Sequence, residues 1–428
     1  MKILFIIHDF LPTHQAGSEI YTYLLARELS KNHDVLLLFT EIHNQKTYRV
    51  TSRTYQGLNC LEVYRPCADP LKDSSYNDAK MAEIFKSVLT EFDPDVIHLQ
   101  HLLFHSLGYP AIARDKGIPI IFTLHDYWLT CPHWGRRMKD NLELCHEIDV
   151  AQCAECMQGS SEPQFHSLVT RICRLLGFRG NINHAKKSIE KRLQTVHQLI
   201  HDIDLFICPS PFLTKTFADF GVPEEKLSLI SHGFETTRFQ KKKGVRSNGL
   251  RFGYIGTISE HKGIHVLVEA FSQLPEKEAT LEIYGDLDWF PSYSKQLKSA
   301  ANSSGIRFHG AAANEAIPDI LNRIDILVVP SIWFENSPLT IHEAFLAGVP
   351  VITSNLGGMA DLVTHQVNGL LFEVGNTDDL AEKMSLLIAQ PDLVGQLQQS
   401  IPKVKSIKEN GAEIEALYHR LIRTDSVD

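Results

Sequence analysis

The chain has 428 residues, of which 43% are apolar and 22% are charged, as in an ordinary globular protein. One hydrophobic core seldom serves so long a chain, so we expect two domains. The formal net charge of −9 argues against a general nucleic-acid binder, and we expect no nucleic acid as a partner.

The chain begins with an apolar run, residues 1–7, which resembles the core of an export signal but ends at His8 and Asp9. We interpret the run as a buried strand rather than as a signal. No apolar run approaches the roughly 20 residues that cross a bilayer. The sequence therefore predicts a cytoplasmic protein whose eight cysteines are reduced.

In the first half of the chain, short apolar runs alternate with helical patterns, of which 18–29 and 81–91 are the clearest. The predicted buried strands are 3–7, 35–39, 96–99, 118–124 and 205–208. Strands that alternate with helices are typical of a parallel sheet covered on both faces.

The polar segment 240–249 has no apolar period and is the best candidate for a linker. Beyond it the alternation resumes, with predicted strands at 250–255, 279–284, 306–309, 326–329, 349–352 and 369–372, and helices at 266–273, 317–322, 340–346 and 377–389. The sequence thus predicts an α/β fold of two doubly wound, Rossmann-like domains with ligands at the carboxyl ends of their strands. The expected parts are 1–236, 237–404 and a C-terminal helix in 405–428 that packs across the domain junction.

The most informative segment is 333–352, which follows the predicted strand 326–329. We expect Ser337 to cap the next helix and Pro338 to occupy its first position. The helix N-terminus then suits a phosphate or diphosphate. Glu335 and Glu343 bracket this end at a Glu-x7-Glu spacing and could accept hydrogen bonds from hydroxyls on either side of a bound diphosphate. A capping carboxylate and a solvated helical glutamate would explain the fragment equally well.

Taken together, four segments resemble the retaining glycosyltransferases of family 4, which have the GT-B fold. They are Ala16-Gly-Ser-Glu19, residues 252–270, residues 326–348, and residues 355–363 followed by 368–372. The resemblance implies two domains that face a central cleft. It also implies a hexosyltransferase that moves a sugar from a UDP-, GDP- or ADP-linked donor to a hydroxyl of a glycan or lipid-linked acceptor, in surface polysaccharide or glycolipid synthesis.

The resemblance assigns catalytic roles to His125, Lys262 and Glu335. Lys262 would neutralise the donor diphosphate, and Glu335 would lie near the donor sugar. His125, at the end of a predicted strand, would hydrogen-bond that sugar. The alternatives are a solvated loop lysine and a buried structural histidine.

The resemblance also implies a donor-binding set in which Glu343 binds the ribose. Thr257 departs from the family, since many relatives have arginine there, so the helix end is expected to take more of the charge. No cofactor is required under this interpretation, because the leaving diphosphate itself deprotonates the acceptor. The other donor-binding residues are Gly17, Ser18, Lys262, Ser337, Pro338, Leu339, Gly357, Gly358 and Met359.

A long insertion, about 127–200, carries four cysteines: Cys131, Cys145, Cys153 and Cys156. Four thiolates could bind a structural zinc ion, and either His133 or His146 could replace one of them. Free cysteines in a loop packed over the acceptor cleft are an equally weighted alternative.

A basic stretch follows the cysteines, with Leu175, Leu176 and Phe178 interleaved. It could lie on the anionic inner face of a membrane or hold a lipid-diphosphate acceptor, and a solvated basic helix is the alternative. Its charged members are Arg171, Arg174, Arg179, Lys186, Lys187, Lys191 and Arg192.

Two other functions remain open at this point. A nucleotide-sugar epimerase of similar fold would need acid and base groups around the sugar but no acceptor site. A non-catalytic nucleotide-sugar-binding module would need neither. The set of His125, Lys262, Glu335 and Glu343 favours an enzyme, and the insertion favours one with an acceptor.

Overall fold

A computed structural model describes residues 1–43, 47–66, 75–159, 182–240, 249–275, 277–301 and 304–424. The chain divides into two compact units, Met1–Phe234 with Ser406–Asp428, and Glu235–Lys405. Most of the expected linker, 241–248, lies outside the described residues.

The first unit is built on an eight-stranded sheet in the order β3-β4-β2-β1-β5-β6-β7-β8. All neighbouring pairs are parallel except β3 with β4. The strands are β1 Lys2–Ile6, β2 Asp34–His43, β3 Arg49–Tyr55, β4 Leu58–Pro66, β5 Val96–Leu99, β6 Ile120–Thr123, β7 Leu205–Cys208 and β8 Leu227–Leu229.

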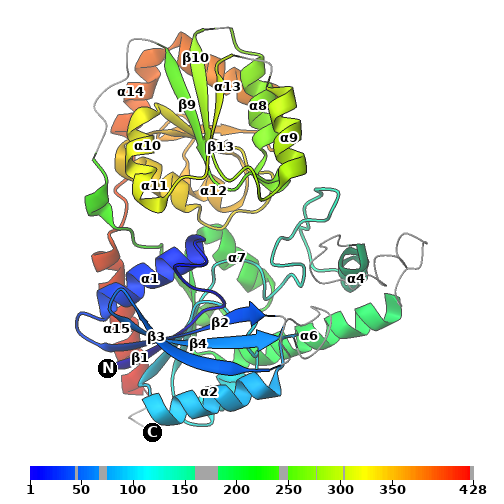
Figure 1. The fold of residues 1–428 in the computed structure, drawn as a ribbon, viewed down its shortest axis with the longest axis vertical. Coiled ribbons are helices and arrows are strands. Elements are labelled where there is room, and N and C mark those ends of the chain that lie inside the picture. Colours follow the sequence, from blue (N-terminus) through cyan, green and yellow to red (C-terminus); the bar gives the residue numbers. More distant parts are fainter. Residues whose placement is uncertain are drawn as a thin grey trace. The chain divides into compact units, whose positions relative to one another are not determined.

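Helices cover both faces of this sheet (Figure 1). They are α1 Gly17–Leu29, α2 Ala79–Phe92, α3 Tyr109–Arg114, α4 Val150–Gly159, α6 Ile182–Asp202, α7 Pro211–Asp219 and α15 Ile407–Thr424. The central strands β1, β5, β6 and β7 are buried along nearly their whole length, which is why they were visible as apolar runs.

The second unit holds a parallel six-stranded sheet in the order β11-β10-β9-β12-β13-β14. Its strands are β9 Leu250–Ile255, β10 Ala279–Tyr284, β11 Ile306–Gly310, β12 Ile326–Val329, β13 Val351–Ser354 and β14 Gly369–Phe372. Its helices are α8 Ile264–Ser272, α9 Pro291–Ala300, α10 Ile317–Arg323, α11 Leu339–Ala347, α12 Gly357–Leu362, α13 Thr377–Ala389 and α14 Pro391–Gln399. Two doubly wound α/β units confirm the predicted fold class.

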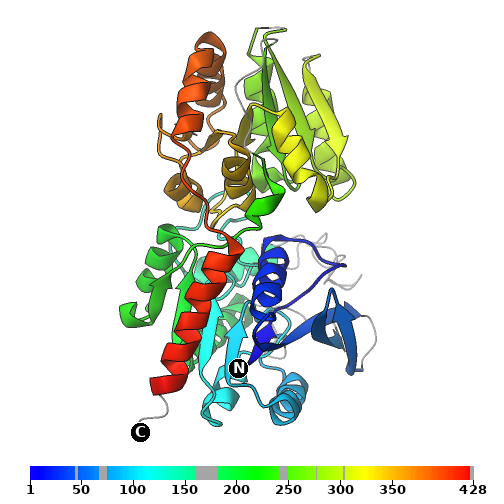
Figure 2. The ribbon, with the colours of Figure 1, turned by 90° about the vertical axis from the view of Figure 1, so that its left-hand side faces the viewer.

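The last helix, α15, is part of the first unit and runs alongside α1 (Figure 2). Ile414 and Tyr418 are fully buried in the same apolar core as the β1 strand. The Tyr418 hydroxyl lies 2.6 Å from Nδ1 of His98, and the Tyr21 hydroxyl donates to Oδ1 of Asn410 at 3.0 Å. The C-terminal helix α15 therefore contributes to the same apolar core as the N-terminal strand β1.

The sequence analysis did not predict the edge strand β3. Its residues are largely polar and alternate between half-buried and exposed positions, so the strand lacks the apolar run that marked the central strands. Among the described residues, no helix is both long enough and apolar enough to cross a membrane.

Candidate active site

In the second unit, the loop between β12 and α11 carries the segment that the sequence singled out. The helix begins at Leu339 and no side-chain hydrogen bond caps it. Pro338 occupies the N-cap position, so the prediction that it fills the first helical position is wrong by one residue. The hydroxyl of Ser337 instead lies 2.9 Å from Nε2 of the buried His342, one turn inside the helix. The prediction that Ser337 caps the helix is therefore wrong, because His342 takes its hydroxyl. In the described part of the chain, no side chain accepts a hydrogen bond from the first N–H groups of α11.

Glu335, in the same loop, has a side chain that is only 12% exposed, and one of its oxygens accepts several hydrogen bonds. Its Oε1 accepts hydrogen bonds from Nζ of Lys262 at 2.7 Å, Oγ of Ser331 at 2.8 Å and Nε1 of Trp333 at 2.8 Å. Burial alone would raise its pKa, but the Lys262 charge and the three hydrogen bonds hold the pKa of Glu335 below its usual value. Among the described residues, none donates a hydrogen bond to Oε2.

Lys262 belongs to this loop cluster and is not a solvated lysine. Its ammonium also lies 4.9 Å from the centre of the Trp333 ring, and 23% of its side chain is exposed. The next residue, Gly263, has φ +70°, and a Cβ there would lie 2.0 Å from the Pro330 carbonyl oxygen. Only glycine allows the loop after β9 to pass so close to the end of β12.

The glycine pair at the start of α12 packs onto the same loop. The Gly358 N–H donates to the Glu335 carbonyl at 2.9 Å, and a Cβ on Gly358 would lie 1.4 Å from the Asn336 carbonyl oxygen. Gly357 has φ +55°. The side chain of Met359 is fully buried, so only its backbone could meet a ligand. The structure thus brings Gly357 and Gly358 to Glu335 and Lys262.

Glu343 lies inside α11 and differs from Glu335 in its surroundings. Burial raises its pKa from 4.5 to about 7, and the charge of Arg238 offsets only part of this rise. Among the described residues, no side chain or backbone group hydrogen-bonds the Glu343 carboxyl. It is therefore not the solvated helical glutamate of the alternative interpretation. A carboxyl whose pKa is raised in this way is typical of a binding or catalytic position.

Thr257 lies in the turn after β9, where its carbonyl accepts a hydrogen bond from the hydroxyl of Tyr254 at 2.7 Å. Tyr254 is buried, so this contact holds the turn from inside. The structure shows how the backbone at Thr257 is held but gives its side chain no distinct role.

In the first unit, His125 follows β6 and is held by Gln100, which follows β5. Its Nε2 lies 2.8 Å from Oε1 of Gln100, and since that oxygen only accepts, the proton lies on Nε2. Burial, and then repulsion from His101, lowers the pKa of His125 to about 3, so the ring is neutral at pH 7. Its ring also stacks with that of His232 at 5.2 Å.

Next to His125 lies a cluster of histidines and carboxylates that the sequence analysis missed. Nε2 of His8 is 3.3 Å from Oε1 of Glu19, and Nε2 of His101 is 3.1 Å from Oδ2 of Asp126. The ligand atoms of His8, Asp9 and Glu19 all lie within 4.8 Å of one another. A signal was present, because β1, β5 and β6 are each followed by a histidine with a polar neighbour: His8-Asp9, Gln100-His101 and His125-Asp126.

The charges of this cluster are set by burial and pairing. Burial disfavours the charged form of each group. It therefore raises the pKa of Glu19, and together with repulsion from His101 it lowers the pKa of His8 to about 3. Asp126 keeps a lowered pKa despite its burial, because His101 and two hydrogen bonds favour its ionised form. Gly17 and Ser18 open α1 beside this cluster, with the Ser18 hydroxyl donating to Glu19 at 3.1 Å.

The basic stretch of the insertion is divided by the structure. Lys187 and Lys191 are exposed on α6. Arg192 is buried, donates to the Leu129 carbonyl at 2.9 Å and lies 5.0 Å over the Trp128 ring. It is therefore a packing residue, and its inclusion in a surface patch was wrong. The predicted residues Arg171, Arg174, Leu175, Leu176, Phe178 and Arg179 lie outside the described residues.

Comparisons with known proteins divide along the same two units. The profile described as Glycosyltransferase Family 4 matches residues 16–155, and the one described as Glycosyl transferases group 1 matches residues 235–411. The amylovoran biosynthesis glycosyltransferase AmsK of Erwinia amylovora is 30% identical over 175 residues, 38% of this chain and 42% of that protein. The chain spans less than half the length of the first curated relatives it matches.

Solved structures match over the whole chain. Sucrose-phosphate synthase from Thermosynechococcus elongatus superposes with a TM-score of 0.72 at 18% identity, covering 99% of each chain. HepE of Anabaena, solved in complex with UDP and glucose, gives a TM-score of 0.64 at 18% identity and covers 100% of each chain. At this identity the likeness establishes the fold, which is the GT-B fold.

Because Lys262 and Glu335 are in contact, the effects of replacing them on the free energy of unfolding should not be additive. We expect Lys262→Ala to lower the free energy of unfolding by about 2–3 kcal/mol, because it leaves a buried carboxylate without its cation. The Lys262→Ala/Glu335→Gln double variant should be less destabilised than the sum of the single changes by about 1 kcal/mol or more. Because the pKa of Glu335 is lowered, this coupling should be complete above pH 4.5 and lost as the pH falls below that value.

Denaturant unfolding of the native chain, Lys262→Ala, Glu335→Gln and the double variant measures the coupling free energy. A matched control is the exposed pair Lys215–Asp219, with the same 2.7 Å separation, where we expect about 0.5 kcal/mol or less. Equal coupling at the two pairs would show that Glu335 is not held as a buried ion.

Proposed function

The chain belongs to the family 4 glycosyltransferases of the GT-B fold, and we propose that it transfers a sugar from a nucleotide-sugar to a hydroxyl with retention of anomeric configuration. The observation that carries this proposal is the loop cluster of the second unit. It places a lysine, an uncapped helix N-terminus and a glycine pair around one buried glutamate.

This cluster suits a diphosphate flanked by two sugars. Lys262 supplies a positive charge that is already positioned, and the first N–H groups of α11, at Leu339 and Thr340, add a partial positive charge. Gly357 and Gly358 have no side chains to keep a ligand from their backbone. We infer that Ser337 and Thr257 contribute their backbone N–H groups, whereas Pro338, which has no N–H, sets the turn into α11.

The two glutamates divide the hydroxyl contacts. Oε1 of Glu335 already accepts three hydrogen bonds, so Oε2 is the oxygen that can accept from a sugar hydroxyl. Within the described ranges Glu343 has no hydrogen-bond donor, and it is suited to accept from the two ribose hydroxyls. Binding of those hydroxyls would favour its ionised form and offset the cost of its burial.

The chemistry requires no covalent enzyme intermediate. The acceptor oxygen attacks the anomeric carbon on the face from which the diphosphate leaves, and the bond between that carbon and the diphosphate oxygen breaks. The departing diphosphate takes the acceptor proton. The residues of the second unit stabilise the charge that grows on the diphosphate, and a donor metal ion is not needed for this step.

The first unit supplies groups that suit a polyhydroxyl ligand. His125 is neutral, and its Nε2–H donates a hydrogen bond to Oε1 of Gln100. The other ring nitrogen, Nδ1, carries no proton and can therefore only accept a hydrogen bond. We infer that it accepts from a hydroxyl of the donor sugar. The carboxyl groups of Glu19 and Asp126 suit the hydroxyls of a glycan or of a lipid-linked sugar, whereas Gly17 and Ser18, at the start of α1, stay predicted contacts of the donor.

The donor is proposed to be a UDP-sugar, with GDP- and ADP-sugars as the other members of the class. HepE, of the same fold, was solved with UDP and glucose, and AmsK is named for the biosynthesis of the polysaccharide amylovoran. The experiment is a donor panel by saturation-transfer NMR, followed by product analysis. We expect one donor to bind, and the new glycosidic bond to keep the anomeric configuration of the donor. Inversion, or epimerisation of the donor without transfer, would contradict the proposal.

In the same assay, Lys262→Ala should lower turnover roughly 10²-fold or more, the usual effect of removing one charge-stabilising donor. Lys295→Ala, on the exposed face of α9, serves as the control and should leave turnover unchanged. Because Lys262→Ala also weakens the fold, both variants are assayed well below their unfolding temperatures.

Glu343 gives the proposal a pH signature. If ribose hydroxyls bind the ionised carboxyl, donor binding releases a proton, and affinity should be about tenfold weaker at pH 6 than at pH 8, given a free pKa of about 7. Calorimetry in buffers of different ionisation enthalpy measures both quantities, and the diphosphate of a nucleotide-sugar does not titrate in this range.

Glu343→Gln is the matched variant. It should bind more weakly at pH 8 and with no pH dependence between 6 and 8. Because a raised pKa means that the fold disfavours the ionised carboxyl, the ligand-free variant should have a higher Tm than the native chain at pH 8 and a similar one at pH 4.5. A pH-independent affinity of the native chain would remove Glu343 from the donor site.

We also propose a peripheral contact with an anionic membrane, for which the exposed lysines of α6 are the support. Co-sedimentation with vesicles containing phosphatidylserine tests it. The native chain should sediment at low salt, and Lys187→Glu/Lys191→Glu should reduce the bound fraction severalfold, whereas an unchanged fraction would place the contact elsewhere or nowhere.

A further inference from the structure

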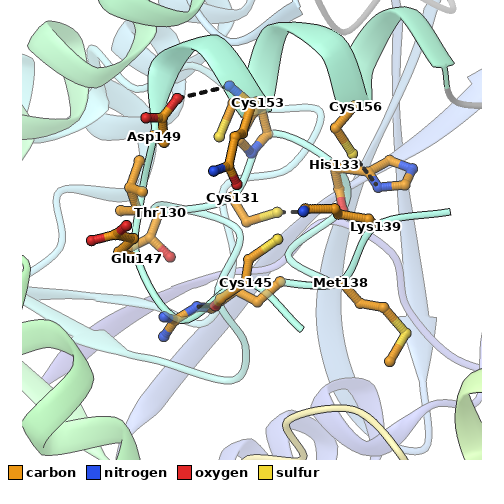
Figure 3. A pocket seen from close by; sticks show the side chains of 14 residues that line it. Thr130, Cys131, His133, Met138, Lys139, Cys145, Glu147, Asp149, Cys153 and Cys156 are labelled. Carbon is orange, nitrogen blue, oxygen red and sulfur yellow. Dashed lines mark hydrogen bonds between the residues drawn. The ribbon is translucent and has the colours of Figure 1, made fainter. Parts of the chain in front are cut away.

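The insertion between β6 and β7 contains a small cavity lined by four cysteines. Cys131, Cys145, Cys153 and Cys156 line it together with His133, and its volume is about 30 Å³. Figure 3 shows Cys131 and Cys145 on the loop side and Cys153 and Cys156 on the helix that covers the cavity. Such a space holds one or two water-sized spheres, which is the scale of a single ion and not of an organic ligand.

Three separate segments bring these thiols together. Cys131 closes a turn after β6, its N–H donating to the Tyr127 carbonyl at 2.7 Å. Cys145 is held at the end of a short loop, where its N–H donates to the Arg137 carbonyl at 2.8 Å. Cys153 and Cys156, three residues apart on α4, project from one face of that helix. Residues spaced by 14, 8 and 3 positions thus line one cavity.

Charged groups of both signs surround the four thiols. The charges of Arg137 and Lys139 act on Cys145, and that of the buried Arg192 acts on Cys131. His133 adds a donor, since its Nδ1 lies 3.4 Å from Sγ of Cys156. The carboxylates Glu143, Asp149 and Asp140 act on Cys145, Cys153 and Cys156 in the opposite sense, and Glu143 pairs with Lys139 at 2.9 Å. A site of net charge −2 would therefore lie among charges of both signs, with His133 as its second-shell hydrogen-bonding group.

The insertion also needs a cross-link. Its described apolar core is small, formed around Ala154, Met157, Ala185 and Ile189. The loop before α4 includes three residues other than glycine with positive φ, namely Trp134 at 54°, Arg137 at 45° and Leu142 at 67°. Such conformations cost about 1 kcal/mol or more each and persist only where the surroundings hold them.

We propose that Cys131, Cys145, Cys153 and Cys156 bind one Zn²⁺ ion tetrahedrally, with His133 donating to the Cys156 sulfur. Zn²⁺ is the ion that four thiolates in a closed tetrahedral site select, and such sites contribute directly to folding. The site holds the loop that leaves β6. A Cβ on Gly135 would lie 2.8 Å from the Trp128 backbone N, and that N–H in turn donates to Oδ1 of Asp126 at 2.8 Å. The zinc is structural and fixes the segment that follows His125.

Metal content is the first measurement. The full chain, purified without chelator, should contain about one zinc per chain by mass spectrometry. Replacing zinc by Co²⁺ should give the thiolate-to-metal charge-transfer bands and visible bands of a tetrahedral cobalt–thiolate site. This spectrum uses the native chain, so it does not depend on any variant folding.

Variants identify the ligands. Cys153→Ser/Cys156→Ser should abolish both the zinc and the cobalt spectrum, and Cys60→Ala, a buried thiol of β4 in the same unit, should change neither. His133→Ala should keep the stoichiometry and lower zinc affinity about 10-fold or more. Loss of all metal in His133→Ala would overturn the four-cysteine set.

Other outcomes would overturn the site as a whole. They are a native chain that binds no zinc even when reduced and titrated with the ion, a disulfide between any two of the four cysteines, or unchanged metal in Cys153→Ser/Cys156→Ser. Hydrogen exchange separates this proposal from the proposed function. Removal of zinc should increase exchange in residues 126–157 and leave residues 250–372, and nucleotide-sugar binding by them, unchanged.

Discussion

The second unit depends on the burial of one carboxylate. The Glu335 side chain is only 12% exposed, yet its pKa is held below the usual value, because Lys262, Ser331 and Trp333 donate to a single oxygen. That requirement draws the loop after β9 to the end of β12, which Gly263 permits, and it orients the backbone on which Gly358 rests. The lysine, the glycine pair and the end of α11 are therefore parts of one arrangement.

The two glutamates show that environment, and not residue type, decides what a carboxyl can do. Glu335 is held ionised by its partners, whereas burial pushes the pKa of Glu343 to about 7 with only Arg238 to oppose it. Glu335 is therefore ionised before a ligand binds. The carboxyl of Glu343 can be stabilised in its charged form by a ligand, so its ionisation should change when a ligand binds. Glu335 is already ionised without a ligand and mainly holds the loop in place.

The sequence predicted the two α/β units and most central strands, because buried parallel strands are short apolar runs. The spacing of motifs also predicted Glu335, Glu343 and Lys262 as site residues. The sequence could not show that Ser337 gives its hydroxyl to His342, or that Arg192 lies buried on Trp128, because both depend on tertiary neighbours. The edge strand β3 was missed for a related reason, since a half-exposed strand need not be apolar.

The histidine cluster of the first unit shows a limit of a different kind. His8, His101 and His125 each follow a strand, and they meet only because the carboxyl ends of β1, β5 and β6 lie side by side in the sheet. Once together, burial and mutual repulsion keep His8 and His125 neutral, with the pKa of each lowered to about 3. The two units thus differ at their strand ends. The second presents a paired cation and an uncapped helix, which suit an anion, whereas the first presents neutral imidazoles and carboxylates, which suit hydroxyl groups.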